Sequence, residues 1–207
     1  MQVLNQHAAQ SAMDPLKNEN PSSRDSADPF AYWRSAPLAD LVSHLAAEHI
    51  RWTGADLPHM EELIRKASGE VQPANPALAP IASGLSRLRE TLTKHFRGEE
   101  QVLFPTAVAL ERAVASHSPI GRPSFGSVRN PVSLLTREHE EEGRLMKNLR
   151  GVCEQHNLSG SASEELRQLN DALRQLQDAL SQHRQVENEV LFPRMVELER
   201  TAREFKQ

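Results

Sequence analysis

One sequence pattern occurs twice in the chain and constrains its fold more than any other feature. It reads H-x-x-x-E-[EN]-x-V-L-F-P and runs from His95 to Pro105 in the first copy and from His183 to Pro193 in the second. A His and a Glu four residues apart lie on one face of an α-helix, about 40° apart around its axis. Each copy therefore predicts a helix that offers one nitrogen and one carboxylate oxygen to the same point in space.

The leucines before each copy show where this face points. They recur at intervals of three or four residues, the spacing of a buried helix face. Continuing the rhythm leads to His183, Glu187 and Val190 in the second copy, and to His95, Glu99 and Val102 in the first. We therefore expect the core-facing side of both helices to run directly into His and Glu.

A buried carboxylate without a strong partner is costly, and these apolar stripes offer no matching Lys or Arg. A metal ion is the natural partner. Two further histidines, His49 and His139, continue apolar stripes on the other expected helices. The predicted metal-ligand set is His49, His95, Glu99, His139, His183 and Glu187.

Four imidazoles and two carboxylates can serve two metal ions, with two histidines for each ion and both glutamates bridging. Imidazole and carboxylate suit iron, manganese or zinc, and the absence of thiolates on the core faces argues against an iron–sulfur cluster. Two bridging carboxylates inside a helical bundle favour two non-haem iron ions, joined by an oxo or hydroxo bridge.

The fold class expected is all-α, an up-down-up-down four-helix bundle with an internal two-fold pseudo-repeat. Each half has one helix with a single core His, followed by one with H-x-x-x-E. The first two expected helices are 35–66, with an interruption near Gly54 and Pro58, and 81–115, with a bend at Pro105. The third is 130–156 and is capped by Asn130. The fourth is 161–203, which a capping box opens at Ser161 and which bends at Pro193.

The domain organisation expected is a flexible N-terminal tail at 1–34, with a short helical piece near Phe30 to Trp33, followed by the bundle at 35–207. The tail is rich in Asn, Gln, Ser, Asp and Pro and shows no helical periodicity. With 207 residues and 38% hydrophobic residues, the chain can build a sizeable core.

Charge and cysteine content narrow the function classes. A formal net charge of -4 gives no reason to expect nucleic acid or an anionic membrane as partner. The single cysteine, Cys153, excludes an internal disulfide and fits a reducing compartment. No apolar run is long enough for a membrane span or a secretory signal, so we expect a cytoplasmic protein.

Each of these signals also has a simpler interpretation. A single core histidine is usually only a packed residue, and one H-x-x-x-E is usually an exposed polar pair. Two copies in phase with apolar stripes are much harder to explain without a metal. The V-L-F-P segments are expected to pack and bend the helices rather than bind metal, and Cys153 to act as a small hydrophobe. Glu138 and Glu142 belong to a solvated charged run, or else hydrogen-bond a ligand imidazole.

The motifs resemble the hemerythrin-like, or HHE cation-binding, superfamily, and most closely the RIC (repair of iron centres) di-iron proteins. The resemblance covers roughly residues 38–198. Its carriers are E-H at Glu48-His49 with L-P at Leu57-Pro58, H-x-x-x-E-E-Q-V-L-F-P from His95, E-H-E-E-E-G from Glu138, and H-x-x-x-E-N-x-V-L-F-P-R from His183. The resemblance implies the same six metal ligands as the stripe argument.

The chain departs from related patterns at three places. Oxygen-carrying hemerythrins usually have a second His four residues after the third-helix ligand, where this chain has Gly143, which favours the RIC-like branch. Many RIC proteins carry an N-terminal cysteine pair, which is absent here. The segment between His49 and Leu57-Pro58 is about one residue longer than the usual spacing.

The function that this resemblance implies is a nitrosative or oxidative stress response, through iron–sulfur cluster repair, nitric oxide binding or nitric oxide reduction at the di-iron centre. The expected partners are nitric oxide or dioxygen as a small ligand, and iron–sulfur proteins. One alternative is a hemerythrin-type sensor or buffer that binds nitric oxide or dioxygen without turnover. Another is a metal-buffering protein.

Overall fold

The computed structural model describes residues 28–70, 75–121, 123–160 and 163–205. Within them every regular element is helical, so the all-α prediction is confirmed. The elements are α1 (Ala31–Ser35), α2 (Leu38–Arg51), η1 (Trp52–Asp56), α3 (Leu57–Glu70), α4 (Leu78–Gly98), η2 (Glu99–Leu103), α5 (Phe104–Ala115), α6 (Arg129–Gln155), η3 (Leu158–Gly160), α7 (Glu164–Val186), η4 (Glu187–Leu191) and α8 (Phe192–Glu204).

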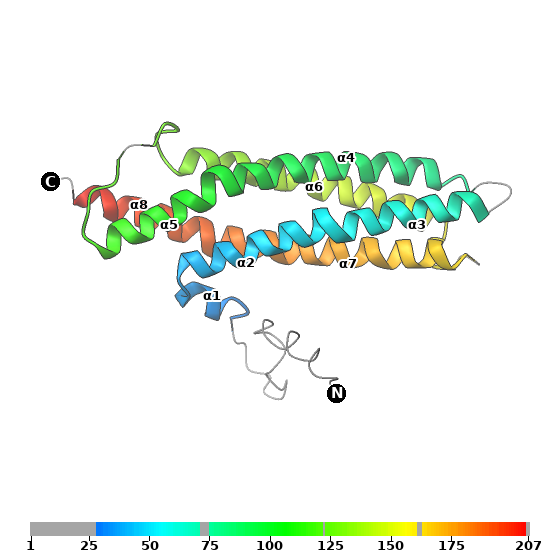
Figure 1. Cartoon of the computed structure of the whole chain (residues 1–207), viewed down its shortest axis with the longest axis horizontal. Helices are drawn as coiled ribbons and strands as arrows, with labels where there is room; N and C mark the ends of the chain where they lie inside the picture. The colour runs from blue at the N-terminus through cyan, green and yellow to red at the C-terminus, as the bar shows by residue number, and fades with distance from the viewer. Residues whose placement is uncertain (1–27, 71–74, 122, 161–162, 206–207) are drawn as a thin grey trace, which may run out of the picture.

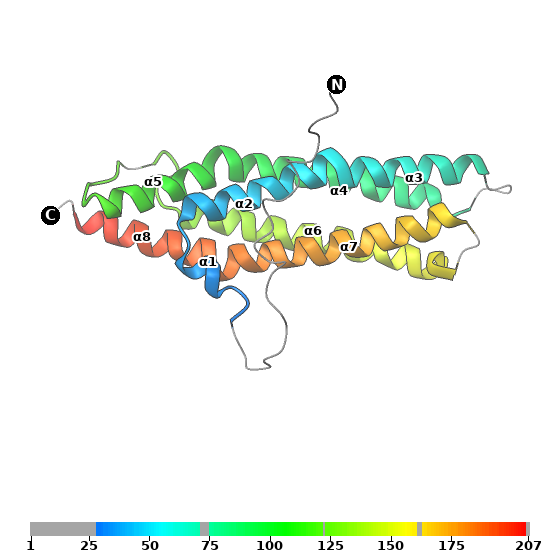
Figure 2. The same cartoon turned by 60° about the horizontal axis from the view of Figure 1, so that its bottom comes forward.

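These elements form four long rods that run antiparallel from one to the next (Figure 1). The first rod joins α2 to α3, the second joins α4 to α5, the third is α6 alone, and the fourth joins α7 to α8 (Figure 2). This is the predicted up-down-up-down four-helix bundle. Within the described part of the chain, no helix is both long and apolar enough to cross a membrane.

Three of the rods contain a turn of π-helix, namely η1, η2 and η4. Each π turn is followed, after one residue, by a proline: Pro58, Pro105 and Pro193. A proline ring has no N–H and clashes with the carbonyl of the preceding turn, and a wider turn relieves that clash. The third rod has no proline beyond its first turn and stays α-helical. The interruptions predicted from these prolines are therefore π turns inside continuous rods.

The π turn η2 changes which residues face the core. The sequence predicts Val102 on the buried stripe, but its side chain is 37% exposed, while Leu103 is only 1% exposed. A π turn takes up one more residue than an α turn, so the buried stripe after Glu99 moves one position along the chain. The prediction for Val102 is therefore wrong, whereas the matching prediction for Val190 is confirmed, since Val190 is only 1% exposed although it lies in the π turn η4.

The apolar core consists of two clusters, one toward each end of the bundle. Every rod contributes to both clusters and passes from one to the other near its middle. The passage lies between Leu45 and Trp52, between Phe96 and Leu103, between Leu135 and Met146, and between Leu180 and Val186. All six predicted metal ligands lie in these stretches or one residue beyond them, so they form a polar layer between two apolar ones.

The predicted short helix near Phe30 to Trp33 is confirmed as α1, and Trp33 packs into the core with 9% exposure. Residues 1–27 of the predicted tail lie outside the described residues. The guanidinium of Arg194 on α8 donates to the carbonyls of Trp33 (2.8 Å) and Ala36 (2.7 Å) and to the carboxylate of Glu111 (3.1 Å). This clamp sets the point at which the first rod enters the bundle.

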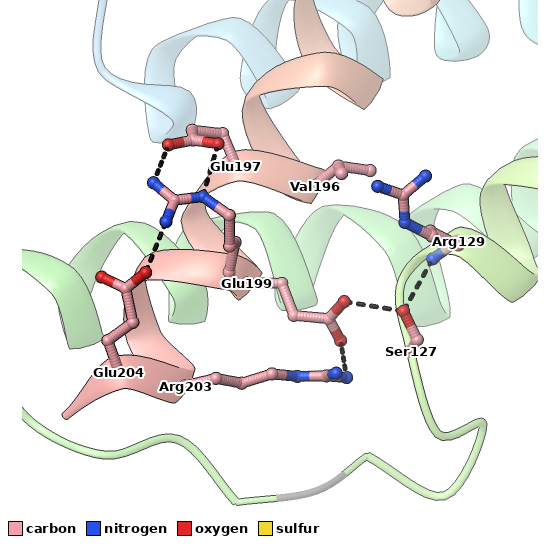
Figure 3. A pocket seen from close by; sticks show the side chains of 8 residues that line it. Ser127, Arg129, Val196, Glu197, Glu199, Arg203 and Glu204 are labelled. Atoms are coloured by element: carbon pink, nitrogen blue, oxygen red, sulfur yellow. Dashed lines mark hydrogen bonds and ion pairs between the residues drawn. The ribbon is translucent and has the colours of Figure 1, made fainter. Parts of the chain in front are cut away.

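The third rod begins differently from the prediction, which made Asn130 its cap. The carboxylate of Glu199 on α8 accepts a hydrogen bond from the Ser127 hydroxyl at 2.7 Å (Figure 3). It also accepts one from the Val128 N–H at 3.2 Å, and the helix starts at the next residue. The Asn130 amide instead donates to the carbonyl of Phe125 at 2.7 Å. The capping oxygens come from a distant part of the chain, which sequence-local reasoning does not reveal.

The other rod ends lie close to their predicted places. α4 begins at Leu78 rather than Ile81, because Pro80 fits within the first turn, where a missing N–H costs nothing. α7 begins at Glu164, which is the last residue of the predicted capping box. The first residue of that box, Ser161, lies outside the described residues.

Replacing Leu92 tests the packing next to the polar layer. Leu92 is fully buried one turn before His95. We expect Leu92→Ala to lower the free energy of unfolding by about 2–5 kcal/mol, because it removes buried methyl groups and leaves a cavity. The control is Leu134→Ala on α6, where the side chain is 50% exposed and the expected change is within about 0.5 kcal/mol. Urea unfolding followed by circular dichroism measures both, and equal losses would contradict the packing described.

Candidate metal centre

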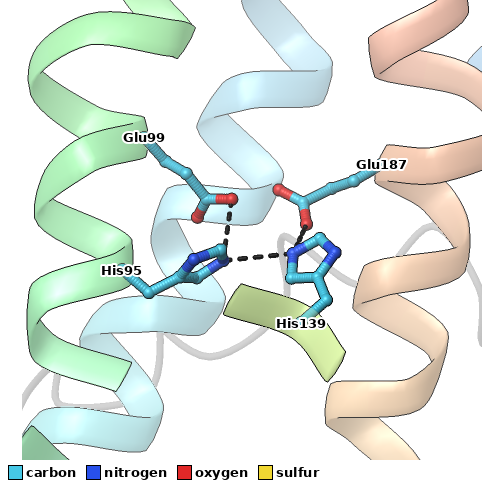
Figure 4. Close-up of side chains that lie close together, drawn as sticks. All are labelled: His95, Glu99, His139 and Glu187. Atoms are coloured by element: carbon cyan, nitrogen blue, oxygen red, sulfur yellow. Dashed lines mark hydrogen bonds and ion pairs between the residues drawn. The ribbon is translucent and has the colours of Figure 1, made fainter. Parts of the chain in front are cut away.

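The six predicted ligands meet at the centre of the bundle, one or two from each rod. Their exposed fractions lie between 0% and 5%. They form two groups whose nitrogen and oxygen atoms lie within 4.8 Å of one another: His95, Glu99, His139 and Glu187 in one, and His49, Glu99 and His183 in the other. Figure 4 shows the first group, with side chains from three rods pointing toward one another.

Glu99 belongs to both groups. One of its carboxylate oxygens, Oε1, lies 3.0 Å from Nε2 of His95, and the other, Oε2, lies 3.3 Å from Nε2 of His49. The two oxygens of a single carboxylate therefore face two different histidine pairs.

Glu187 has the same arrangement on the opposite side. Its Oε2 lies 3.1 Å from Nε2 of His139, and its Oε1 lies 3.5 Å from Nε2 of His183. The two carboxylates thus stand between a pair formed by His95 and His139 and a pair formed by the other two histidines. This placement matches the expectation of two histidines for each ion with both glutamates between them.

The donor atoms fit a cation better than they fit one another. All four carboxylate oxygens of Glu99 and Glu187 are buried without an aligned hydrogen-bond donor among the described residues. The Nε2 atoms of His95 and His139 face each other at 3.1 Å, and those of His49 and His183 at 3.2 Å. Facing lone pairs repel unless a proton or a metal ion lies between them, so the chemistry of this donor set suits metal ions.

Electrostatics lead to the same conclusion. Burial, and next the negative charge of Glu187, raise the pKa of Glu99 well above its ordinary value. Burial, and next repulsion from a protonated His183, lower the pKa of His49 to about 3. Without a metal ion the carboxyl and the imidazole are therefore both driven toward their neutral forms. Bound cations would reverse the preference of the carboxyl, because metal ligands bind in the deprotonated form.

Three of the four imidazoles hold a carboxylate at their other nitrogen, Nδ1. The contacts are Glu48 with His183 (2.8 Å), Glu138 with His95 (3.1 Å) and Glu100 with His49 (2.9 Å). A carboxylate at Nδ1 holds the proton there, which leaves Nε2 free to bind a metal and makes it more basic. The interpretation of Glu138 as a partner of a ligand imidazole is therefore confirmed, although its partner lies on a different rod from the adjacent His139.

The V-L-F-P segments pack as expected, and they do so directly against the centre. The ring of Phe104 stacks near His49 with a centroid distance of 5.7 Å, and that of Phe192 stacks near His139 at 6.1 Å. Each repeat therefore supplies a buried carboxylate and, after its π turn, an aromatic ring that stacks near an imidazole of another rod.

Sequence reasoning missed Glu48 and Glu100 as partners of the imidazoles. The available signal was adjacency, since each stands next to a predicted ligand in the chain. Of the histidines outside the predicted ligand set, His44 is partly buried and stacks on Trp33 at 4.8 Å, and His59 is exposed. Neither belongs to the two metal-competent groups.

Comparisons with known proteins agree with this geometry. Residues 128–207 match the hemerythrin HHE cation binding domain. This match covers 80 of the chain's 207 residues. The chain is also 27% identical over 166 residues to the iron-sulfur cluster repair protein YtfE of Salmonella paratyphi B, Salmonella newport and Salmonella heidelberg, with 78% of this chain and 68% of each relative covered. The resemblance to the hemerythrin-like superfamily and to repair proteins is therefore confirmed.

The hemerythrin match contains His139, His183 and Glu187, half of the predicted ligand set. The other half of the set comes from the first two rods through the repeated motif.

Glu142 is a buried carboxyl beside the centre, only 1% exposed, with its Oε1 3.6 Å from Nδ1 of His95. Burial raises its pKa from 4.5 to about 7. The folded chain therefore holds this proton more tightly than the unfolded chain does. Its contribution to stability is present below pH 4.5 and is lost as the pH rises to about 7.

This titration predicts a pH-dependent effect of Glu142→Gln in metal-free protein. Between pH 4.5 and pH 8 the unfolding free energy of the variant minus that of the wild type should rise by roughly 3 kcal/mol, since one pKa unit corresponds to about 1.4 kcal/mol. Urea unfolding at several pH values measures the difference. The exposed neighbour Glu141→Gln is the control and should follow the wild type. A constant difference between Glu142→Gln and the wild type would rule out the titration.

Proposed function

We propose that the bundle of residues 35–207 is a non-haem di-iron protein. One iron would be held by His95 and His139 and the other by His49 and His183. Glu99 and Glu187 would bridge the two. The observation that carries this proposal is that each buried carboxylate turns one oxygen toward each histidine pair.

Iron is favoured over other metals by the donor set and its surroundings. Imidazole and carboxylate suit iron, and carboxylate bridges inside a helical bundle are typical of di-iron proteins. Two adjacent irons supply one-electron redox chemistry and open coordination positions for a small ligand such as nitric oxide or dioxygen. The protein's part is to keep the site dry, to hold the protons at Nδ1 of three imidazoles, and to fix the two carboxylates between the rods.

The cellular role we infer is a cytoplasmic response to nitrosative or oxidative stress, in which the protein restores damaged iron–sulfur clusters. Support comes from the similarity to the iron-sulfur cluster repair protein YtfE and from a donor set without thiolates, from which iron can leave as a simple ion. The partners would be iron–sulfur proteins, with nitric oxide as a ligand that is bound or reduced at the centre.

One observation favours a second function, that of a sensor or buffer that binds nitric oxide or dioxygen without turnover. The ligands are at most 5% exposed, and deep burial favours retention of the metal over its transfer. The two functions share the same centre and differ in whether iron leaves it.

Metal content tests the di-iron proposal. Protein purified from iron-supplied cells should hold close to two irons per chain and show near-ultraviolet charge-transfer absorption. Glu99→Ala or Glu187→Ala should lose half or more of the iron, because each removes oxygens that serve both histidine pairs. The matched controls His44→Ala and His156→Ala should keep it, since neither residue belongs to the metal-competent groups. One zinc, or no metal in a folded chain, would overturn the proposal.

Two anaerobic experiments separate the functions. The first uses a [4Fe–4S] dehydratase that nitric oxide has damaged, in a mixture that contains sulfide and a thiol reductant. Iron-loaded protein added to this mixture should restore dehydratase activity faster than metal-free protein does. Nitric oxide titrated into the reduced protein reports binding and, by gas analysis, reduction. Recovery of the dehydratase supports repair, whereas stoichiometric gas binding without recovery or turnover supports the sensor.

A further inference from the structure

The internal repeat relates the two halves of the centre residue by residue. Aligning the repeated motif places His183 opposite His95 and Glu187 opposite Glu99. The contacts at Nδ1 follow the same relation for two of the imidazoles. Glu48, just before the first-rod ligand, contacts His183, and Glu138, just before the third-rod ligand, contacts His95.

The other two imidazoles break the symmetry. Nδ1 of His49 holds the carboxylate of Glu100 at 2.9 Å. The repeat places Asn188 where the first half has Glu100, and Asn188 is exposed. Nδ1 of His139, the related atom, is buried and has no hydrogen-bond partner among the residues that the structure describes.

The surroundings of the two histidine pairs also differ. Aromatic rings cover the pair formed by His49 and His183: Phe96 stacks on the first at 3.8 Å, and Trp52 meets the second edge-on at 5.0 Å. Phe104 also stacks near His49. These rings form an apolar wall that hinders the approach of water to that pair.

Charged groups replace two of those rings in the other half, while Phe192, the counterpart of Phe104, stacks near His139. The repeat places Arg184 opposite Phe96, and Glu142 opposite Trp52. Nη1 of Arg184 and Oε1 of Glu142 are both buried without a hydrogen-bond partner among the described residues, as is Nε1 of Trp52 in the aromatic wall. Polar atoms of this kind attract water, and two of them lie on the side of His95 and His139 against one in the aromatic wall.

Both differences act on metal affinity. A carboxylate at Nδ1 fixes the imidazole ring and strengthens its other nitrogen as a ligand, and losing such a partner typically costs 10–100-fold in affinity. The pair of His49 and His183 has this support on both rings, while the pair of His95 and His139 has it on one.

We propose that the two metal positions are unequal, that the ion held by His95 and His139 is the exchangeable one, and that Asn188 sets this difference as a positioning residue. This inference rests on the proposed di-iron function and deepens it. The exchangeable position would be the one that donates iron to an acceptor, while the other ion stays and keeps the centre assembled.

The test is the rate at which a ferrous chelator in excess removes iron from the reduced, fully loaded protein under anaerobic conditions. We expect two phases of equal amplitude, one iron each, with rates that differ about 10-fold or more. Two irons that leave in a single phase would overturn the inference and leave the di-iron proposal standing. A chain that does not hold two irons would overturn both.

Exchanging the two residues that differ shows which position is which. Asn188→Glu should slow the fast phase about 10-fold, because it supplies the missing carboxylate to His139, and should leave the slow phase unchanged. Glu100→Asn should accelerate only the slow phase by a similar factor. Both positions are exposed, with 44% for the Glu100 side chain, so circular dichroism should show an unchanged fold.

A charge control separates contact from overall electrostatics. Gln185→Glu adds the same negative charge at an exposed position on the fourth rod, outside the metal-competent groups. It should leave both phases as in the wild type. If Gln185→Glu slows the fast phase as much as Asn188→Glu does, or if Glu100→Asn leaves the slow phase unchanged, the assignment to Asn188 is overturned.

Discussion

Two carboxylates buried face to face in an apolar bundle are the interaction on which the rest of the structure depends. Glu99 and Glu187 are fully buried, and no described residue offers their oxygens an aligned donor. Such a pair would destabilise the bundle on its own. The surrounding histidines, and the carboxylates behind three of them, turn this liability into a site for cations. The two apolar clusters on either side keep water away and hold the rods in register.

The π turns tie this polar layer to the apolar ones. Glu99 and Glu187 are each the first residue of a π turn, and a phenylalanine follows each turn. The widened turn lets a proline enter the rod and shifts the buried stripe, so that the phenylalanine ring reaches an imidazole on another rod. The repeated motif therefore encodes a ligand, a change of helical phase and a packing ring in one short segment.

Periodicity and repetition made most of the fold and the ligand set predictable from sequence. Two leucine stripes run into His and Glu, which requires a buried polar layer. Two further apolar stripes contain a single His, and the four stripes together predict four rods. A regular helical period does not predict where that period changes, which is why Val102 was predicted to lie in the core. Contacts between distant segments were equally hidden. Examples are the contacts of Glu199 with the start of α6 and of Glu48 with His183, since neither glutamate shows in the sequence which distant segment it meets.

Duplication builds a centre with two related halves, and this chain departs from that relation around the predicted ligands as well as in the π turn that the first rod has and the third lacks. The ligand types are the same in both halves, because a change there would remove a bond to metal. Among the residues one position away, Phe96 stacks on His49 and Glu100 contacts its Nδ1, whereas Nη1 of Arg184 is buried without a partner among the described residues and Asn188 is exposed. In the di-iron centre that we propose, changes at such positions would adjust how tightly each ion is held without altering the number of its ligands. Under the proposed repair function, this combination would let one iron leave while the bundle around the other stays folded.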